Sequence, residues 1–167
     1  MPTPDEILAQ LNLPLTHKLT LDDLVRRIGD ATQRTILLIP WSLPREIFGA
    51  WISDARRPTE YIFYQKDLTP LHRVHVVLHE VSHFLLGHKT VRVEARDVLG
   101  TLQGGEDTVS PAVTCAIQLR AGATISLLDD QEAEKLAAAI GEKLSRRTVT
   151  SSLSSDESVS AVLRKLG

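Results

Sequence analysis

The sequence predicts a single α+β domain in which helices flank a small, mostly antiparallel sheet, and three observations support this fold class. The chain has 167 residues, an ordinary size for one domain. Hydrophobic residues make up 43% of it and charged residues 24%, which excludes a largely disordered or fibrous chain. One helical pattern comes first, short strand patterns follow, and further helical patterns occupy the rest, an order typical of α+β proteins.

The first helical pattern begins after Thr20, whose hydroxyl is a suitable N-terminal cap. Asp22 and Asp23 follow in the first turn, where the helix dipole favours negative charge. Four apolar residues then share one face: Leu21, Leu24, Val25 and Ile28. Gly29 indicates where this helix ends.

Three short segments rich in β-branched and aromatic residues predict the strands. The first is Thr35–Ile39, which we expect to end at Pro40. The others are Gly49–Ser53 and Tyr61–Tyr64, and residues 54–59 between them contain two arginines and a proline. Such a connection predicts a β-hairpin or two neighbouring strands of one sheet.

Helical patterns dominate the second half of the chain. Leu71–Leu86 has a long apolar period, follows a proline and ends at Gly87. Residues 89–110 contain three glycines, which favours a loop in the middle of this stretch. Pro111–Ala121 has proline at the first helical position, and Asp129–Ser145 begins with two acids, so both predict helices.

The composition changes near residue 147 and divides the chain into two parts. Residues 1–146 are expected to form the folded domain. Residues 147–167 are rich in serine and threonine and have few apolar side chains to bury, so the entropy of ordering them is not offset. We expect a mobile tail there, with a short helix over 158–166.

The net charge and the cysteine content indicate which kinds of partner the protein binds and in which cellular compartment it works. The net charge is −2, which gives no footprint for direct binding of nucleic acid or of an anionic membrane. Cys115 is the one cysteine, so no internal disulfide forms, and we expect it to pack among the small apolar residues around it. The N-terminus lacks a signal-peptide pattern and no apolar run is long enough to span a membrane, so a cytoplasmic location is predicted.

Residues 79–83 read His-Glu-Val-Ser-His, an HExxH motif inside the predicted helix. Because His79 and His83 are four residues apart, their imidazoles project from the same side of the helix. Two imidazoles at this spacing can bind one Zn²⁺ at about 2.0–2.1 Å. Glu80 lies about 100° around the helix from His79, within reach of a zinc-bound water. This pattern is typical of metallopeptidases in which the glutamate is the general base.

Other histidines lie close to this motif. Four of them share one stripe of the helix: His72, His75, His79 and His83. His75 is one turn before His79, where it could orient a ligand or touch substrate, but His72 and His75 also suit a polar rim near the helix start. His88 follows Gly87, and we expect it to cap the carboxyl end of the helix. Leu86 stands where a metzincin has glycine, which disfavours that class.

A zinc site needs a third protein ligand, and the acidic start of the last long helix can supply it. Five residues define the inward face of that helix: Ala133, Leu136, Ala137, Ile140 and Leu144. Asp129 and Asp130 lie within about 65° of the centre of this stripe, and Glu132 and Glu134 lie about 100° to either side. The angles therefore favour one of the two aspartates. The alternative is that these acids only complement the helix dipole.

The segment His79-Glu80-Val81-Ser82-His83-Phe84-Leu85-Leu86-Gly87-His88 resembles the ImmA/IrrE family of zinc metallopeptidases. Members carry a second helix of the type E-x-x-A-N/D-x-F-A, which Asp130–Ala137 fits loosely. The resemblance places Asp130 at the position of the zinc-binding glutamate and Glu134 one turn later, where it could support a ligating histidine. Leu136 replaces the usual phenylalanine, and the family's LLMP ending is missing.

The resemblance implies a thermolysin-like (zincin) core with a gluzincin-like zinc site of His79, His83 and Asp130, and with Glu80 as the catalytic residue. It also implies a protein substrate, a helix-turn-helix transcriptional repressor whose cleavage derepresses mobile-element or stress genes. Glu134 would be a supporting residue or an alternative ligand. Direct contact with nucleic acid is not expected, since the repressor would be a separate chain.

Three functional hypotheses remain open at this point. The first is a zinc-dependent endopeptidase, with the strand near Gly49–Ser53 or Tyr61–Tyr64 holding the substrate backbone by strand addition. The second is a binding module that captures a repressor or another protein without cleaving it. The third is a structural protein whose histidines decorate the surface. Zinc content separates the third hypothesis from the others, and the substitution Glu80→Gln separates the first from the second.

Overall fold

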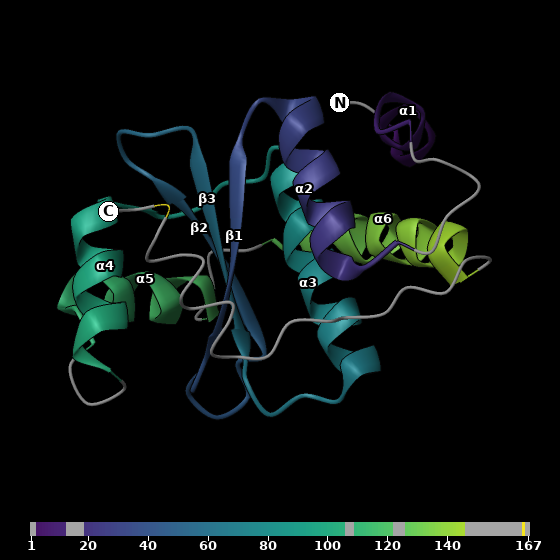
Figure 1. Cartoon of the computed structure of the whole chain (residues 1–167). Coiled ribbons are helices and arrows are strands. Elements are labelled where there is room, and N and C mark those ends of the chain that lie inside the picture. Colours follow the sequence, from purple (N-terminus) through teal and green to yellow (C-terminus); the bar gives the residue numbers. More distant parts are fainter. Residues whose placement is uncertain (1–2, 13–18, 106–108, 122–125, 146–164, 166–167) are drawn as a thin grey trace.

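The protein is described by a computed structural model over residues 3–12, 19–105, 109–121, 126–145 and 165. Within these residues a four-stranded sheet lies between two layers of helices (Figure 1), so the expected α+β class is confirmed. The helices are α1 (Pro4–Gln10), α2 (Leu21–Thr32), α3 (Pro70–Leu85), α4 (Ala95–Gly104), α5 (Pro111–Ala121) and α6 (Leu127–Ser145). The strands are β1 (Thr35–Trp41), β2 (Gly49–Asp54), β3 (Thr59–Gln65) and β4 (Arg92–Val93).

The sheet has the order β1-β3-β2-β4 and is mixed. Strands β2 and β3 form the predicted antiparallel hairpin, with Trp51 opposite Ile62. Strand β1 pairs with β3 in parallel, and β4 pairs with β2 in parallel. The expectation of a mostly antiparallel sheet is therefore wrong. Turn residues at 54–59 specify the hairpin locally, whereas the parallel pairs join strands that no tight turn connects.

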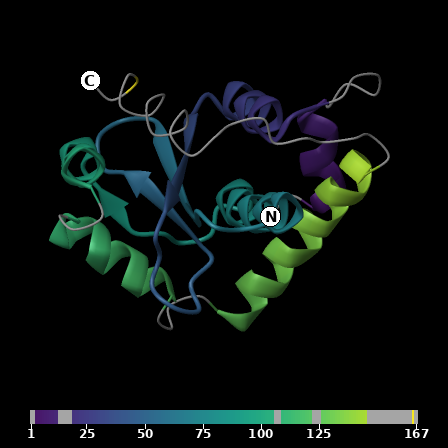
Figure 2. The same ribbon diagram turned by 60° about the horizontal axis from the view of Figure 1, so that its bottom comes forward.

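Side chains that alternate along β2 and β3 build two separate cores. Trp51 and Ile62 face a core formed with α1, α2, α3 and α6, and Ile52 and Phe63 face a core formed with α4 and α5. Figure 2 shows the two helical layers on opposite sides of the strands. The inward face of α6 is buried as expected, and it packs on α3. This packing brings the acidic start of α6 to the helix that carries residues 79–83.

Threonine caps fix the starts of α2 and α3. The Thr20 hydroxyl accepts a hydrogen bond from the amide of Asp23, and Thr69 does the same for His72 before Pro70 opens α3. The expectation that α2 ends at Gly29 is wrong. The helix continues to Thr32, and its C-cap residue Gln33 adopts a left-handed conformation. Gly29 instead permits a close approach, since a Cβ there would lie 2.6 Å from the carbonyl oxygen of Arg34.

Several local predictions are corrected by the fold. Strand β1 runs through Pro40, because it is an edge strand and the missing N–H is tolerated there. The stretch expected to be a glycine-containing loop holds β4 and α4, and Gly100 lies inside this helix. Helix α1 was not expected; its signal is a capping box between Thr3 and Glu6.

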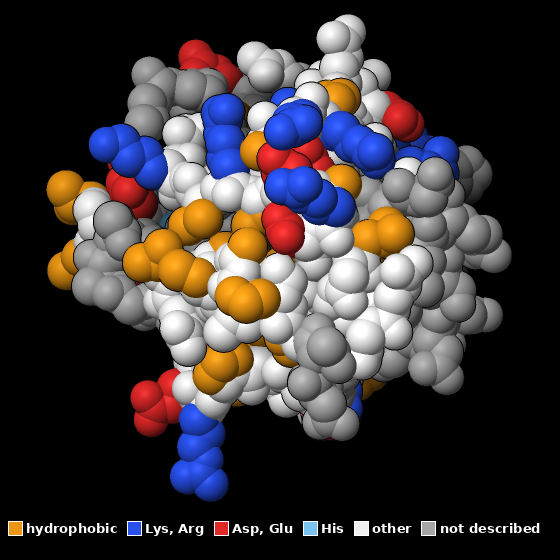
Figure 3. All heavy atoms as spheres, turned by 90° about the vertical axis from the view of Figure 1, so that its left-hand side faces the viewer, with side chains coloured by type: hydrophobic (Ala, Val, Ile, Leu, Met, Phe, Trp, Pro, Cys, Tyr) orange, Lys and Arg blue, Asp and Glu red, His pale blue; other side chains and the backbone are white. Residues whose placement is uncertain are grey.

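The helix α4 begins at the end of the sheet that carries the β2–β3 turn. Its N-cap, Glu94, makes no side-chain cap and instead pairs with Arg56 and Arg96, each at 2.9 Å. Figure 3 shows the face that carries α4 and α5, with Lys and Arg side chains gathered around acidic ones in its upper part.

The tail predicted for residues 147–167 lies outside the described residues, apart from Lys165. The terminal helix expected over 158–166 also lies outside the described residues, apart from Lys165. In the part of the chain that the structure describes, no helix combines the length and apolar character needed to cross a membrane.

Candidate metal centre

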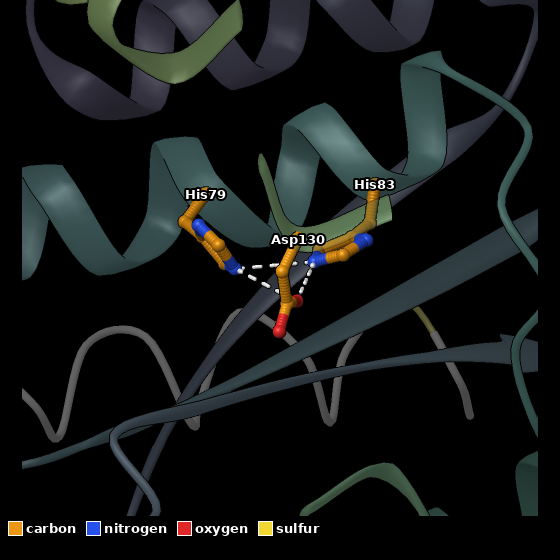
Figure 4. A group of neighbouring side chains, drawn as sticks. All are labelled: His79, His83 and Asp130. Atoms are coloured by element: carbon orange, nitrogen blue, oxygen red, sulfur yellow. Dashed lines mark hydrogen bonds and ion pairs between the residues drawn. The ribbon is translucent and has the colours of Figure 1, made fainter. Parts of the chain in front are cut away.

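Three predicted ligand residues converge between α3 and α6. Nε2 of His79 lies 3.1 Å from Nε2 of His83, and Oδ1 of Asp130 lies 3.8 Å and 3.3 Å from these two nitrogens. Figure 4 shows both imidazoles pointing from α3 toward the Asp130 carboxylate, which comes from the first turns of α6. Their ligand atoms all lie within 4.8 Å of one another, so the group could hold a metal ion.

The triangle formed by these three atoms fits a zinc ion well. Ligand atoms about 2.0–2.1 Å from a tetrahedral Zn²⁺ lie roughly 3.3 Å from one another. The three separations of 3.1, 3.3 and 3.8 Å bracket this value, and a circle through the three atoms has a radius of about 2.0 Å. These three atoms could therefore hold a zinc ion.

Glu134 supports His79 from the next turn of α6. Its Oε2 lies 3.2 Å from Nδ1 of His79, the ring nitrogen that does not face Asp130. Its Oε1 lies 3.7 Å from Nε2 of His75. When Nδ1–H donates a hydrogen bond to a carboxylate, the ring proton stays on Nδ1 and the Nε2 lone pair is available for a metal. Glu134 thus lies where the resemblance places a supporting residue.

His83 is fully buried and contacts a second histidine. Its Nδ1 lies 2.9 Å from Nδ1 of His88, and Nε2 of His88 lies 3.4 Å from Oε2 of Glu132. His88 caps the carboxyl end of α3, as expected, but with its backbone amide and not with its imidazole. Its backbone amide closes the helix by donating to the carbonyl of His83, after Gly87 adopts a positive φ of 68°. The imidazole is turned inward instead.

The acids at the start of α6 divide between the two histidine environments. Asp130 and Glu134 contact the pair on α3, whereas Asp129 and Glu132 lie near His88 and form a second group of possible ligand atoms with it. Negative charge therefore surrounds the imidazoles on the α6 side, which favours a cation between them.

The carboxylate of Glu80 is positioned by β2. Its Oε2 accepts a 2.9 Å hydrogen bond from the backbone amide of Trp51, and the residue is only 7% exposed. Gly49 makes room for this contact, because a Cβ there would lie 3.1 Å from Oε1 of Glu80 and 2.7 Å from Cγ1 of Val76. Helix α3 and strand β2 can approach this closely only at a glycine.

A cavity of about 350 Å³ opens beside these residues. Glu80, His79 and Glu134 line one part of it, and Phe48 and Gly49 line another. The ring of His72 lies 5.1 Å from that of Phe48 at its rim, and both His72 and His75 are exposed, as expected of a polar rim.

Gly49 is the residue of β2 that lines this cavity, and the direction of its backbone groups follows from that of Trp51. In the antiparallel ladder Trp51 turns its N–H and C=O away from β3, toward Glu80 and the hydroxyl of Thr90. By the same alternation Gly49 turns its backbone groups outward. Tyr61–Tyr64 belongs to an interior strand, so the suggestion that it accepts a substrate strand is wrong.

A larger cavity of about 780 Å³ lies toward the other end of the sheet, beside the end of β2 and the start of β3, and has a different chemistry. Its buried carboxylate, Glu60, is bound by the guanidinium of Arg34, the hydroxyl of Ser53 and the indole N–H of Trp51. A carboxylate satisfied in this way stabilises the fold and is not available as a metal ligand.

The expectation that Cys115 packs among apolar residues is wrong, because its side chain is exposed on α5. Its neighbours Val113 and Ala116 fill the core between the sheet and α5, on the side of the sheet opposite α3. The thiol is therefore separated from the candidate metal centre by the sheet.

Comparison of the chain with protein-family models, with curated proteins and with solved structures finds no match.

Proposed function

We propose that this protein is a zinc-dependent endopeptidase of the ImmA/IrrE type, with a gluzincin-like site on a thermolysin-like core. The observation that carries the proposal is the convergence of His79, His83 and Asp130, three residues that the motif and the resemblance select before any geometry is considered. Their donor set, two imidazoles and one carboxylate, is typical of hydrolytic zinc sites.

The roles of the side chains follow from their positions. His79, His83 and Asp130 would hold the ion, which supplies Lewis acidity toward a water and toward the scissile carbonyl. Glu80 would take a proton from the attacking water and deliver it to the leaving nitrogen as the C–N bond breaks. The Trp51 amide orients the Glu80 carboxylate at the edge of the cavity.

We infer that the substrate is a protein segment in extended form. The outward-facing backbone groups of Gly49 border the same cavity as Glu80 and can pair with a peptide over a short stretch. Following the resemblance, the proposed substrate is a helix-turn-helix repressor, cut to derepress mobile-element or stress genes, and the proposed location is the cytoplasm.

One observation favours the second candidate, a module that captures a repressor without cleaving it. Glu80 is nearly buried, and one carboxylate oxygen is bound to the Trp51 amide, so its access to a water is narrow. A protein that kept the ion and the cavity but not the proton transfer would bind the same partner.

The experiment that separates these functions uses the full chain reconstituted with zinc. Metal analysis is expected to give one Zn²⁺ per chain, and His83→Ala is expected to abolish this binding. The zinc-loaded protein is then incubated with a helix-turn-helix repressor encoded next to its own gene, and the products are analysed by mass spectrometry.

A single cut in the repressor, lost in Glu80→Gln while zinc is retained, supports the endopeptidase. Stable binding of an intact repressor by both proteins supports the capture module. Full zinc content in His83→Ala would contradict the metal centre, and with it both functions in the form proposed here.

A further inference from the structure

His88 is a buried imidazole that the proposed mechanism does not use. Its side chain is 2% exposed, although the residue follows the end of α3 and precedes β4. Burial of a polar ring is favourable only when its nitrogens have partners. Both nitrogens have one: Nδ1 faces His83 and Nε2 faces Glu132.

We propose that His88 is a positioning residue for the metal ligand His83, and that Glu132 positions His88 in turn. This inference rests on the proposed metal centre, since it assigns a task to His88 only when His83 binds an ion. His88 would touch neither substrate nor ion.

The direction of each hydrogen bond follows from the position of the ligand atom. Nε2 of His83 faces His79 and Asp130, so it must be unprotonated when it binds a cation. The ring proton of His83 is then on Nδ1, and this N–H donates a hydrogen bond to Nδ1 of His88 at 2.9 Å. The proton of His88 is consequently on Nε2, where it donates to Oε2 of Glu132 at 3.4 Å. Each imidazole thus has one defined tautomer.

The same contacts explain why a histidine is needed at this position. Ligating histidines generally donate their second ring proton to a carboxylate, a carbonyl or water, which fixes the ring orientation. His79 follows this rule directly through Glu134 at 3.2 Å. Nδ1 of His83 is buried, and the ring of His88 spans the gap between it and the carboxylate at the start of α6.

A second metal ion is the competing explanation, because His88, Asp129 and Glu132 also have ligand atoms close together. It would require Nδ1 of His88 to remain toward His83 while Nε2 loses its proton to bind the ion. The two explanations therefore predict different stoichiometries and different protonation of Nε2 in His88.

The test measures zinc affinity by competition with a chelator and the tautomers of the histidine rings by ¹⁵N NMR, both on the full chain. Wild type is expected to bind one Zn²⁺ and to show His88 protonated at Nε2. Glu132→Ala is expected to weaken zinc binding by roughly 10-fold, and His88→Ala by roughly 10–100-fold. Glu132→Gln keeps an accepting oxygen and is expected to recover most of the loss.

Glu132 is about half exposed, so its variants will fold even if His88→Ala does not. Glu142→Gln changes an exposed acid farther along α6 and is the matched control, with zinc affinity unchanged. Zinc affinity that is unchanged in both Glu132→Ala and His88→Ala would overturn the inference while leaving the metal centre intact. Two Zn²⁺ per chain, with one lost in Glu132→Ala, would overturn it in favour of a second site. Absence of zinc binding in wild type would overturn both this inference and the proposed function.

Discussion

The backbone amide of Trp51 donates a 2.9 Å hydrogen bond to Oε2 of Glu80 and so ties the glutamate of the HExxH motif to strand β2. This contact joins residues 29 positions apart in the chain, and it exists only because Gly49 has no side chain between β2 and α3. The orientation of the proposed general base therefore depends on a glycine outside the motif.

Gly49→Ala is expected to impair the proposed peptidase without removing zinc. The new Cβ would lie 2.7 Å from Cγ1 of Val76, a branched side chain with little freedom on a helix, so α3 must shift away from β2. Overpacking of this kind typically costs about 1–3 kcal/mol of stability. Thermal unfolding, zinc content and cleavage rate are measured together. Gly100→Ala is the control, because a Cβ there meets nothing within 4 Å and stability should be unchanged or slightly higher.

Asp130→Ala is expected to lower zinc affinity sharply, because it removes a carboxylate that faces both Nε2 atoms. Asp129→Ala removes a neighbouring acid that lies near His88 instead, and it should have a much smaller effect. Chelator competition on the two variants measures the difference. If Asp129→Ala were the more damaging change, the choice of Asp130 as third ligand would be wrong.

Glu134→Ala is expected to reduce zinc affinity or activity by roughly 10–100-fold while the stoichiometry stays at one. The loss arises because Nδ1 of His79 would no longer have its carboxylate acceptor at 3.2 Å. Titration with Co²⁺, whose visible spectrum reports coordination geometry, checks that the three ligands are still bound. A variant that binds no metal at any concentration would make Glu134 a ligand instead of a support.

Tyr61→Phe is expected to change the pH dependence of stability on the other side of the sheet. Burial raises the pKa of Asp54, but hydrogen bonds from the Tyr61 hydroxyl and from the amides of Arg56 and Arg57 outweigh it, so this pKa is lowered overall. A lowered pKa stabilises the fold above the unfolded value of about 3.9, and this stability is lost as the pH falls through the folded value.

Removal of the Tyr61 hydroxyl should therefore cost about 1.5–3 kcal/mol near pH 7, where Asp54 is ionised. The difference from wild type should narrow as the pH falls below about 4. Urea unfolding at several pH values measures this difference. Zinc content is the internal control and should not change, since Tyr61 belongs to the core between the sheet and helices α4 and α5. A difference that is independent of pH would contradict the charge-dependent hydrogen bond.

Much of the local structure was accessible from the sequence because its signals are short-range. Thr20 and Thr69 cap helices within three residues, and the buried stripe of α6 repeats within two turns. The spacing of His79 and His83 places both imidazoles on one face before any tertiary contact forms. Helix angles also favoured Asp129 and Asp130 over the two glutamates, because they depend only on the periodicity of α6.

Tertiary packing decided what these local signals leave open. The packing of α6 on α3 places Asp130 beside the Nε2 atoms of His79 and His83. It also places Glu134 in contact with His79, and Glu132 in contact with His88. The parallel pairing of β1 with β3 and the inward turn of His88 follow no local pattern either. Each of these contacts joins side chains or strands from separate elements, so it depends on how the elements are placed against one another. Periodicity and capping determine the elements themselves, and the burial of apolar faces determines which of their polar groups meet.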